Sequence, residues 1–182
     1  RYRDLDTPIA EVLESFAARA PAAAHLLVKV HPLDPCVKRW HERVTGLAAK
    51  AGLGDRVHVA HHGVLDEMLR RARGLVTINS TVGLRALALG RPVKALGLAV
   101  WDVPGLAHQG ELDDFWAAAE PPEPDLCEDF LAALQATTQL RGVFYGREGR
   151  LAAVAATIAQ LHDDRVGAGL PVPAPLIPGF PV

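Results

Sequence analysis

Short β-prone runs alternate with helical stretches along the first hundred residues, and this alternation limits the possible folds more than any other feature of the sequence. We predict strands at 26–30, 57–60, 74–78 and 93–96, and helices at 36–51, 64–71 and 84–89. Consecutive parallel strands need a crossover connection, usually a helix, and such crossovers are right-handed. The pattern therefore predicts an α/β fold with a doubly wound parallel sheet.

The segments that flank this alternation are predicted to be helical. A first helix is expected to have Thr7 as its N-cap and Pro8 at its first position, and later helices are expected at 112–118, 126–138 and 151–162. We accordingly divide the chain into a Rossmann-like domain (1–146), a C-terminal helix (147–166) and a flexible, proline-rich tail (167–182).

Composition excludes several classes of protein. With 182 residues, of which 49% are hydrophobic, the chain can bury a core without disulfides. The formal net charge of −2 and the scattered basic residues argue against nucleic acid as a partner. Cys36 and Cys127 lack the spacing of a disulfide framework, which favours a reducing, cytoplasmic compartment. No signal peptide and no apolar run long enough to span a bilayer is found.

Three loops hold most of the unusual polar residues, and each follows a predicted strand. In open parallel sheets, ligands bind at the carboxyl ends of the strands. That rule selects the segments 31–35, 61–63 and 79–83. Because residue types and topology agree, we expect the binding site at this edge of the sheet.

The segment Asn79-Ser80-Thr81-Val82-Gly83 joins a strand to a helix. First-turn amides of a helix lack partners and carry partial positive charge, so with the nearby hydroxyls they can bind a phosphate or carboxylate. Gly83 would let the helix approach the sheet or the ligand closely. The alternative is that Asn79 or Ser80 only caps the helix. The sequence pattern favours neither interpretation.

His31-Pro32 ends the first strand, because Pro32 disfavours helical backbone at His31. An imidazole at the sheet edge can donate to a phosphate or hold a leaving group, and Lys29 shares its face of the strand. A packed or solvated histidine at a strand end is the commoner role and remains the alternative.

Other polar residues carry weaker signals. Adjacent side chains such as His61 and His62 rarely reach one ion, and no nearby Cys or Asp completes a ligand set, so we expect no metal. His108 and Gln109 are candidate substrate contacts in the loop after the fourth strand. The segment 111–116 is predicted to be a structural anchor. Neither GxGxxG nor a Walker motif occurs, which argues against an NAD site or a P-loop ATPase.

Five segments between residues 25 and 146 carry a family resemblance. They are VKVHPLDP (28–35), VTINSTVGLRAL (76–87), GRPVKALG (90–97), VPGLAHQGELDDFW (103–116) and TQLRGVFYG (138–146). In this order they resemble the capsule polysaccharide biosynthesis proteins. Within that family they look most like the β-Kdo transferases that start the capsule lipid anchor.

The resemblance implies the Rossmann-like C-terminal lobe of a GT-B glycosyltransferase that inverts at the anomeric carbon without metal or cofactor. It further implies CMP-Kdo as donor, a phosphatidylglycerol-type lipid acceptor, other capsule biosynthesis and export proteins as partners, and a peripheral location at the cytoplasmic face of the inner membrane. His31 and Pro32 match the family's HP motif. The second nucleotide-site motif is matched by Asn79, Ser80, Thr81 and Gly83.

Two features depart from this pattern. Arg85 stands where many sugar-nucleotide transferases have an acidic residue that binds ribose. The general base is expected in an N-terminal half that precedes this chain, so the chain alone is predicted to bind nucleotide weakly without turnover. Three other hypotheses stay open: a GT-B epimerase acting on UDP-GlcNAc, a non-catalytic factor for capsule assembly and export, and a Rossmann-like domain with an unrelated ligand.

Overall fold

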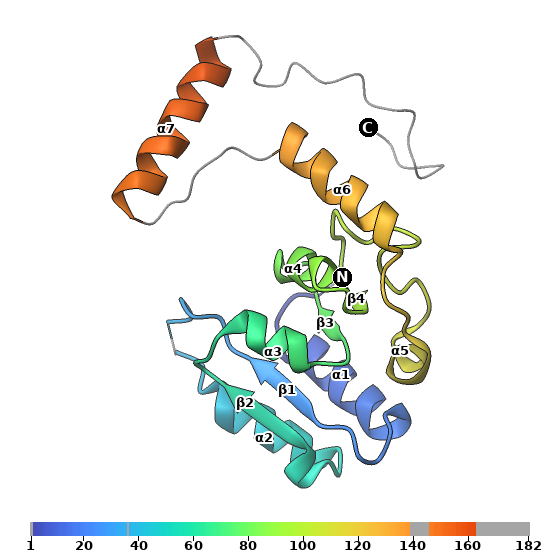
Figure 1. Cartoon of the computed structure of the whole chain (residues 1–182). Coiled ribbons are helices and arrows are strands. Elements are labelled where there is room, and N and C mark those ends of the chain that lie inside the picture. The colour runs from blue at the N-terminus through green and yellow to red at the C-terminus, as the bar shows by residue number, and fades with distance from the viewer. Residues whose placement is uncertain (1, 36, 139–145, 163–182) are drawn as a thin grey trace. The chain divides into compact units, whose positions relative to one another are not determined.

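The computed structural model describes residues 2–35, 37–138 and 146–162, which form a mixed α/β structure (Figure 1). In chain order the elements are α1 (Asp6–Arg19), β1 (Leu26–Lys29), α2 (Trp40–Lys50), the 3-10 turn η1 (Gly54–Arg56), β2 (Val57–Ala60), α3 (Leu65–Arg71), β3 (Leu75–Thr77), α4 (Val82–Ala88), β4 (Val93–Ala95), α5 (Leu112–Ala118), α6 (Pro124–Thr137) and α7 (Arg147–His162). The predicted alternation of strands and helices is confirmed.

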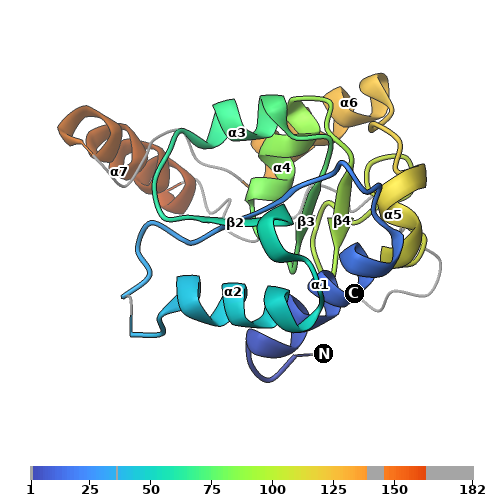
Figure 2. The same cartoon turned by 90° about the horizontal axis from the view of Figure 1, so that it is seen from below.

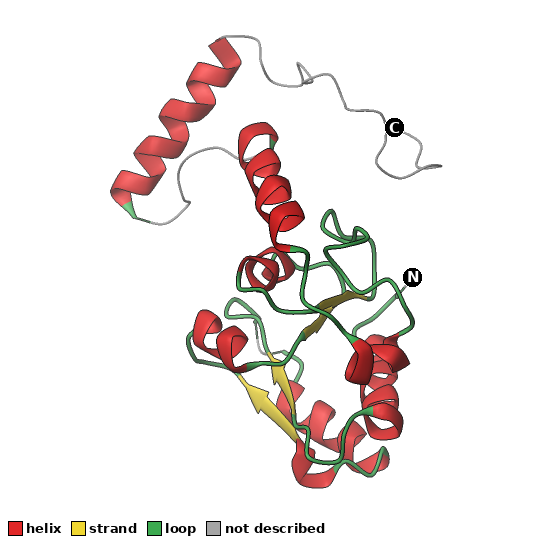
Figure 3. Cartoon of the chain, turned by 45° about the vertical axis from the view of Figure 1, so that its right-hand side comes forward, coloured by secondary structure: helices red, strands yellow, loops and turns green. Residues whose placement is uncertain are grey.

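The four strands form two parallel pairs (Figure 3). β1 runs beside β2 with Leu26 opposite Val57, and β3 runs beside β4 with Leu75 opposite Val93. Parallel pairing is thus confirmed, whereas one continuous sheet is not found among the described strands. Each strand has only three or four residues, so it offers few backbone groups to a second partner.

A hydrophobic core lies between β1–β2 and the helices α1 and α2. Its buried side chains are Leu13, Phe16, Val44, Ala48, Leu53 and Val57. Successive strand residues point to opposite faces, so Leu26 and Val28 pack against this core while Leu27 is 47% exposed. In Figure 2, α2 lies on one side of β2 and α3 on the other. This packing fixes where β1 and β2 end, and therefore where their following loops begin.

The segment 111–116 ties α5 to α1, as predicted for a structural anchor. Ser15 Oγ donates to Asp113 Oδ1 at 2.6 Å, and Trp116 Nε1 donates to Ser15 Oγ at 2.8 Å. The Trp116 ring also meets Phe16 edge to face, with centroids 5.0 Å apart. The buried Ser15 hydroxyl thus both donates and accepts a hydrogen bond, which offsets the cost of its burial.

Two helix starts differ from prediction. α1 begins at Asp6 with Leu5, and not Thr7, at its N-cap position. The Thr7 amide, in the first turn, donates to Asp4 Oδ1 at 2.9 Å. α2 begins at Trp40, four residues later than expected. The Trp40 side chain is tied back to the chain before the helix, because Trp40 Nε1 donates to Asp34 Oδ2 at 2.9 Å.

The chain separates into two compact units, residues 1–128 and 129–182, with the boundary inside α6. Cys36, residues 139–145, the last part of the predicted C-terminal helix (163–166) and the proline-rich tail (167–182) lie outside the described residues. None of the helices in the described ranges combines the length and hydropathy that a bilayer-spanning segment requires.

Candidate functional site

Lys29 joins the loops that follow β1 and β2. Its Nζ donates to the Val30 carbonyl at 2.6 Å and to the His61 carbonyl at 3.1 Å. The Val30 amide donates to the Ala60 carbonyl at 2.9 Å, which extends the strand pairing by one residue. Two of the three ammonium protons are therefore used to hold the two strand ends together.

His31 lies exposed at the end of β1, where its ring has a defined orientation. Nδ1 accepts a hydrogen bond from the Leu33 amide at 3.1 Å, and the His31 carbonyl accepts from Asp34 N at 3.0 Å. Because Nδ1 is the acceptor, the neutral ring carries its proton on Nε2. The loop thus presents one N–H donor to solvent at the strand end.

The loop after β3 (Ile78–Thr81) satisfies the first amides of α4 by itself. Val82 N donates to Ser80 Oγ at 3.2 Å, Gly83 N to the Ser80 carbonyl at 3.0 Å, and Leu84 N to the Thr81 carbonyl at 3.1 Å. Thr81 occupies the N-cap position, and Ser80 Oγ accepts from the first amide of the helix. Each of the three amides thus has an acceptor within the chain in this conformation, and anion binding at this loop stays a prediction. Asn79 and Thr81 remain exposed.

Gly83 makes room for Trp101 and not for a ligand. An added Cβ at Gly83 would lie 2.2 Å from Trp101 Cε2. Trp101 is 1% exposed, and its Nε1 donates to the Ser80 carbonyl at 3.2 Å. The indole therefore packs against Gly83 and holds the loop after β3. This contact leaves no local sequence pattern, because Gly83 and Trp101 are 18 positions apart.

An ion pair joins α3, the helix that follows β2, to α4, the helix that follows β3. Asp66 lies in the first turn of α3, and Arg85 is the fourth residue of α4. Arg85 Nε donates to Asp66 Oδ1 at 2.8 Å and Nη2 to Oδ2 at 2.6 Å. The hydrogen bond from Arg85 holds the pKa of the Asp66 carboxyl below its ordinary value of 3.8. Arg85, which stands where many sugar-nucleotide transferases have an acidic residue, therefore makes a structural contact with Asp66.

Lys29 thus links the first predicted loop to the second. The Asp66–Arg85 pair links α3 and α4, the helices that follow the second and third loops. Exposed side chains with neutral donors follow two of the strands: His31 comes after β1, and Asn79 and Thr81 come after β3. Pro32, the residue after His31, is also exposed. Donors of this kind suit an anionic ligand such as a phosphate.

His108 and Gln109 lie elsewhere. The His108 amide donates to the carbonyl of Val93, the first residue of β4, whereas Asn79 follows the last residues of β3. The His108 ring packs edge to face on Phe115 at 5.6 Å, and Gln109 Nε2 donates to Asp102 Oδ1 at 3.1 Å. The structure therefore places His108 at the opposite end of the β3–β4 pair from the three loops.

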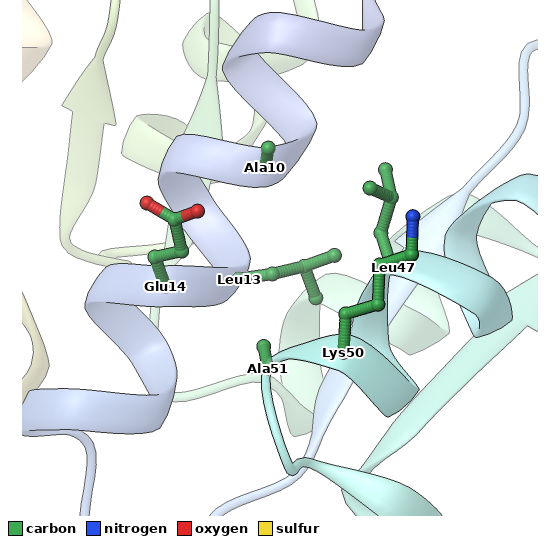
Figure 4. Close-up of a pocket in the computed structure, with 6 residues that line it drawn as sticks. All are labelled: Ala10, Leu13, Glu14, Leu47, Lys50 and Ala51. Atoms are coloured by element: carbon green, nitrogen blue, oxygen red, sulfur yellow. The ribbon is translucent and has the colours of Figure 1, made fainter.

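A surface pocket of about 150 Å³ lies between α1 and α2 (Figure 4). Its lining residues are Ala10, Leu13, Glu14, Leu47, Lys50 and Ala51. Small-molecule sites usually measure about 300–1,000 Å³. The pocket is therefore too small for a nucleotide sugar, and it lies on the helical face and not at the strand ends.

No group of three His, Cys, Asp or Glu side chains in the described residues is arranged to hold a metal ion. His61 and His62 are both exposed, and only the His61 carbonyl has a role in the contacts above.

Comparison with known proteins identifies relatives of this chain. The family model for capsule polysaccharide biosynthesis proteins matches residues 2–145. The capsule polysaccharide export protein KpsS of Escherichia coli is 38% identical over 144 residues, which is 79% of this chain and 37% of that protein. The capsule polysaccharide modification protein LipB of Neisseria meningitidis serogroup A is 37% identical over 137 residues, 75% of this chain and 33% of its own length.

A shorter match, 42% identical over 55 residues, is to protein FixF of Sinorhizobium fredii. No solved structure matches the chain. The chain spans about a third of the length of the two capsule proteins. Since the family model covers most of the chain and the two capsule proteins match 79% and 75% of it, the chain belongs to the capsule polysaccharide biosynthesis protein family.

Proposed function

We propose that this chain is the nucleotide-sugar-binding half of an inverting glycosyltransferase, the Rossmann-like lobe of a GT-B enzyme. It binds CMP-Kdo, and the longer protein transfers Kdo to a phosphatidylglycerol-type lipid at the cytoplasmic face of the inner membrane. Membership in the capsule polysaccharide biosynthesis family supports a role in that pathway, and the name of the LipB relative, a modification protein, agrees with group transfer.

One observation supports the proposal: each of the three loops follows a strand of a parallel pair, and the first and third carry exposed donor side chains. Ligands of open α/β sheets bind at the carboxyl ends of the strands. The donors are His31 Nε2, Asn79 and Thr81, and the Lys29 contacts hold the first of them in register with the second loop. CMP-Kdo suits this set, because it carries a single phosphate and one sugar carboxylate.

In the proposed reaction the bond between the anomeric carbon of Kdo and the phosphate of CMP breaks, and negative charge grows on the phosphate. An N–H group fixed beside that phosphate stabilises the charge on the departing CMP. It therefore stabilises the transition state more than bound CMP-Kdo. His31 supplies this donor, while Asn79 and Thr81 bind the remaining phosphate oxygens. A monophosphate ester needs no Mg²⁺ clamp. The base that deprotonates the acceptor belongs to the part of the longer relatives that this chain does not span.

Calorimetric titration of CMP and UDP into this chain tests the nucleotide assignment. We expect CMP to bind, and UDP to bind at least tenfold more weakly or not at all. His31→Ala should weaken CMP binding, whereas His41→Ala, an exposed histidine in α2, should leave it unchanged. Equal affinities for CMP and UDP would favour the epimerase-like alternative.

The name of the KpsS relative, an export protein, favours a second candidate function, a non-catalytic role in capsule assembly and export. Transfer of radiolabelled Kdo by the full-length protein separates the two. A labelled lipid product supports the transferase, and the absence of product from a folded, CMP-binding protein supports the accessory role.

A further inference from the structure

Two ion pairs of the same geometry join neighbouring helices in this chain. Asp66 accepts from Arg85 Nε and Nη2, and Asp6 accepts in the same way from Arg43. The carboxylates are similarly accessible, with side-chain exposures of 23% for Asp66 and 32% for Asp6. The pairs therefore match in chemistry and burial, and differ in where they lie.

Only the Asp66–Arg85 pair lies at the candidate site. Asp66 is the second residue of α3, which follows the loop at 61–64. Arg85 is the fourth residue of α4, which follows residues 79–81. Asp6–Arg43 instead connects α1 with α2, on the face that carries the small pocket.

The charge around Asp66 favours a lasting contact. Arg70, one turn further along α3, places its Nη2 3.8 Å from Asp66 Oδ2. One carboxylate thus faces two guanidinium groups, and the hydrogen bond from Arg85 lowers the pKa of this carboxyl below its ordinary value. A bidentate contact also fixes the orientation of the guanidinium group relative to the carboxylate, which a single hydrogen bond does not.

We propose that Asp66 and Arg85 are positioning residues of the nucleotide site, which hold the loop after β3 against the loop after β2 so that Asn79 and Thr81 face the same phosphate as His31. The inference rests on the proposed function and adds to it residues that touch no ligand themselves. Binding sites depend on donor positions to within about 0.5 Å. Exposed ion pairs contribute little to global stability. The pair should therefore matter far more to the site than to the fold.

Hydrogen exchange provides a readout that needs no ligand. The amides of Val82, Gly83 and Leu84 bond to acceptors within the loop after β3, so their protection reports that loop's conformation. Asp66→Asn and Arg85→Gln should each speed their exchange by roughly threefold, and the double variant should speed it no further. The matched variants Asp6→Asn and Arg43→Gln should leave these three amides unchanged.

The second readout is the affinity for CMP of the same five variants and of the wild type. Asp66→Asn and Arg85→Gln should weaken CMP binding several-fold, while their thermal midpoints move no more than those of the control pair. Unchanged exchange at Val82–Leu84 and unchanged CMP affinity in both variants would overturn the inference while leaving the proposed function standing. Failure of the wild-type chain to bind CMP would instead remove the proposed function, and the inference with it.

Discussion

Replacing Gly83 with alanine should destabilise the chain, although alanine is the better helix former. The added Cβ would lie 2.2 Å from Trp101 Cε2, more than about 1 Å inside the ~3.5 Å at which carbon atoms normally meet. Trp101 is 1% exposed and has little freedom to retreat. Overpacking of this kind costs about 1–3 kcal/mol.

Two smaller effects nearly cancel. A shifted indole loses its hydrogen bond to the Ser80 carbonyl, which costs about 1 kcal/mol. Replacing glycine with alanine inside a helix gains about 0.5–1 kcal/mol. The net expectation for Gly83→Ala is a loss of about 1–3 kcal/mol, or a fall in the thermal midpoint of about 2–4 °C for each kcal/mol.

Gly46 in α2 is the matched control. It is exposed, no atom lies within 4 Å of its added Cβ, and Gly46→Ala should therefore stabilise the chain by about 0.5–1 kcal/mol. Urea unfolding followed by circular dichroism measures both variants. The reasoning is refuted if Gly83→Ala is as stable as the wild type, because the indole would then not occupy the space that the structure gives it.

Three further predictions concern the core, the α1–α5 contact and the site. Leu13→Ala should cost about 2–5 kcal/mol in urea unfolding, because the Leu13 side chain is 1% exposed; a loss below 1 kcal/mol would contradict the described core. Hydrogen bonds from Ser15 and then Arg19 lower the pKa of Asp113, so its stabilising contribution is complete above the ordinary carboxyl pKa of 3.8 and disappears as the pH falls through the folded value. The stability difference between wild type and Asp113→Asn should therefore shrink when unfolding is measured below about pH 4, and a difference that grows on acidification would show that the sign is wrong. Lys29→Met should weaken CMP binding at unchanged secondary structure, and equal affinity would show that its two carbonyl contacts do not organise the site.

Much of the fold follows from local pattern. α5 was predicted at the residues where it is found, because its acidic first turn and aromatic anchor are both readable in the sequence. The strands were also located correctly, to within a residue or two at their ends. How many of them pair into one sheet was not readable, since periodicity reports which faces are buried and not which edges are hydrogen-bonded.

The candidate site was only partly predictable. The topological rule identified the three loops. In the structure Lys29 links the first two, and the Asp66–Arg85 pair links the helices that follow the second and third. A helix cap and an anion site share one sequence signature, so the role of Ser80 at the start of α4 needed coordinates. The packing of Trp101 on Gly83 and the pairing of Arg85 are long-range contacts that leave no local pattern.

The most direct test of the account is a CMP titration followed by amide and side-chain chemical shifts of the isotope-labelled chain. The account predicts that shifts concentrate at His31, Asn79 and Thr81, while His108, at the other end of β4, does not change. Shifts centred on the pocket between α1 and α2, or the absence of any shift at millimolar CMP, would contradict it.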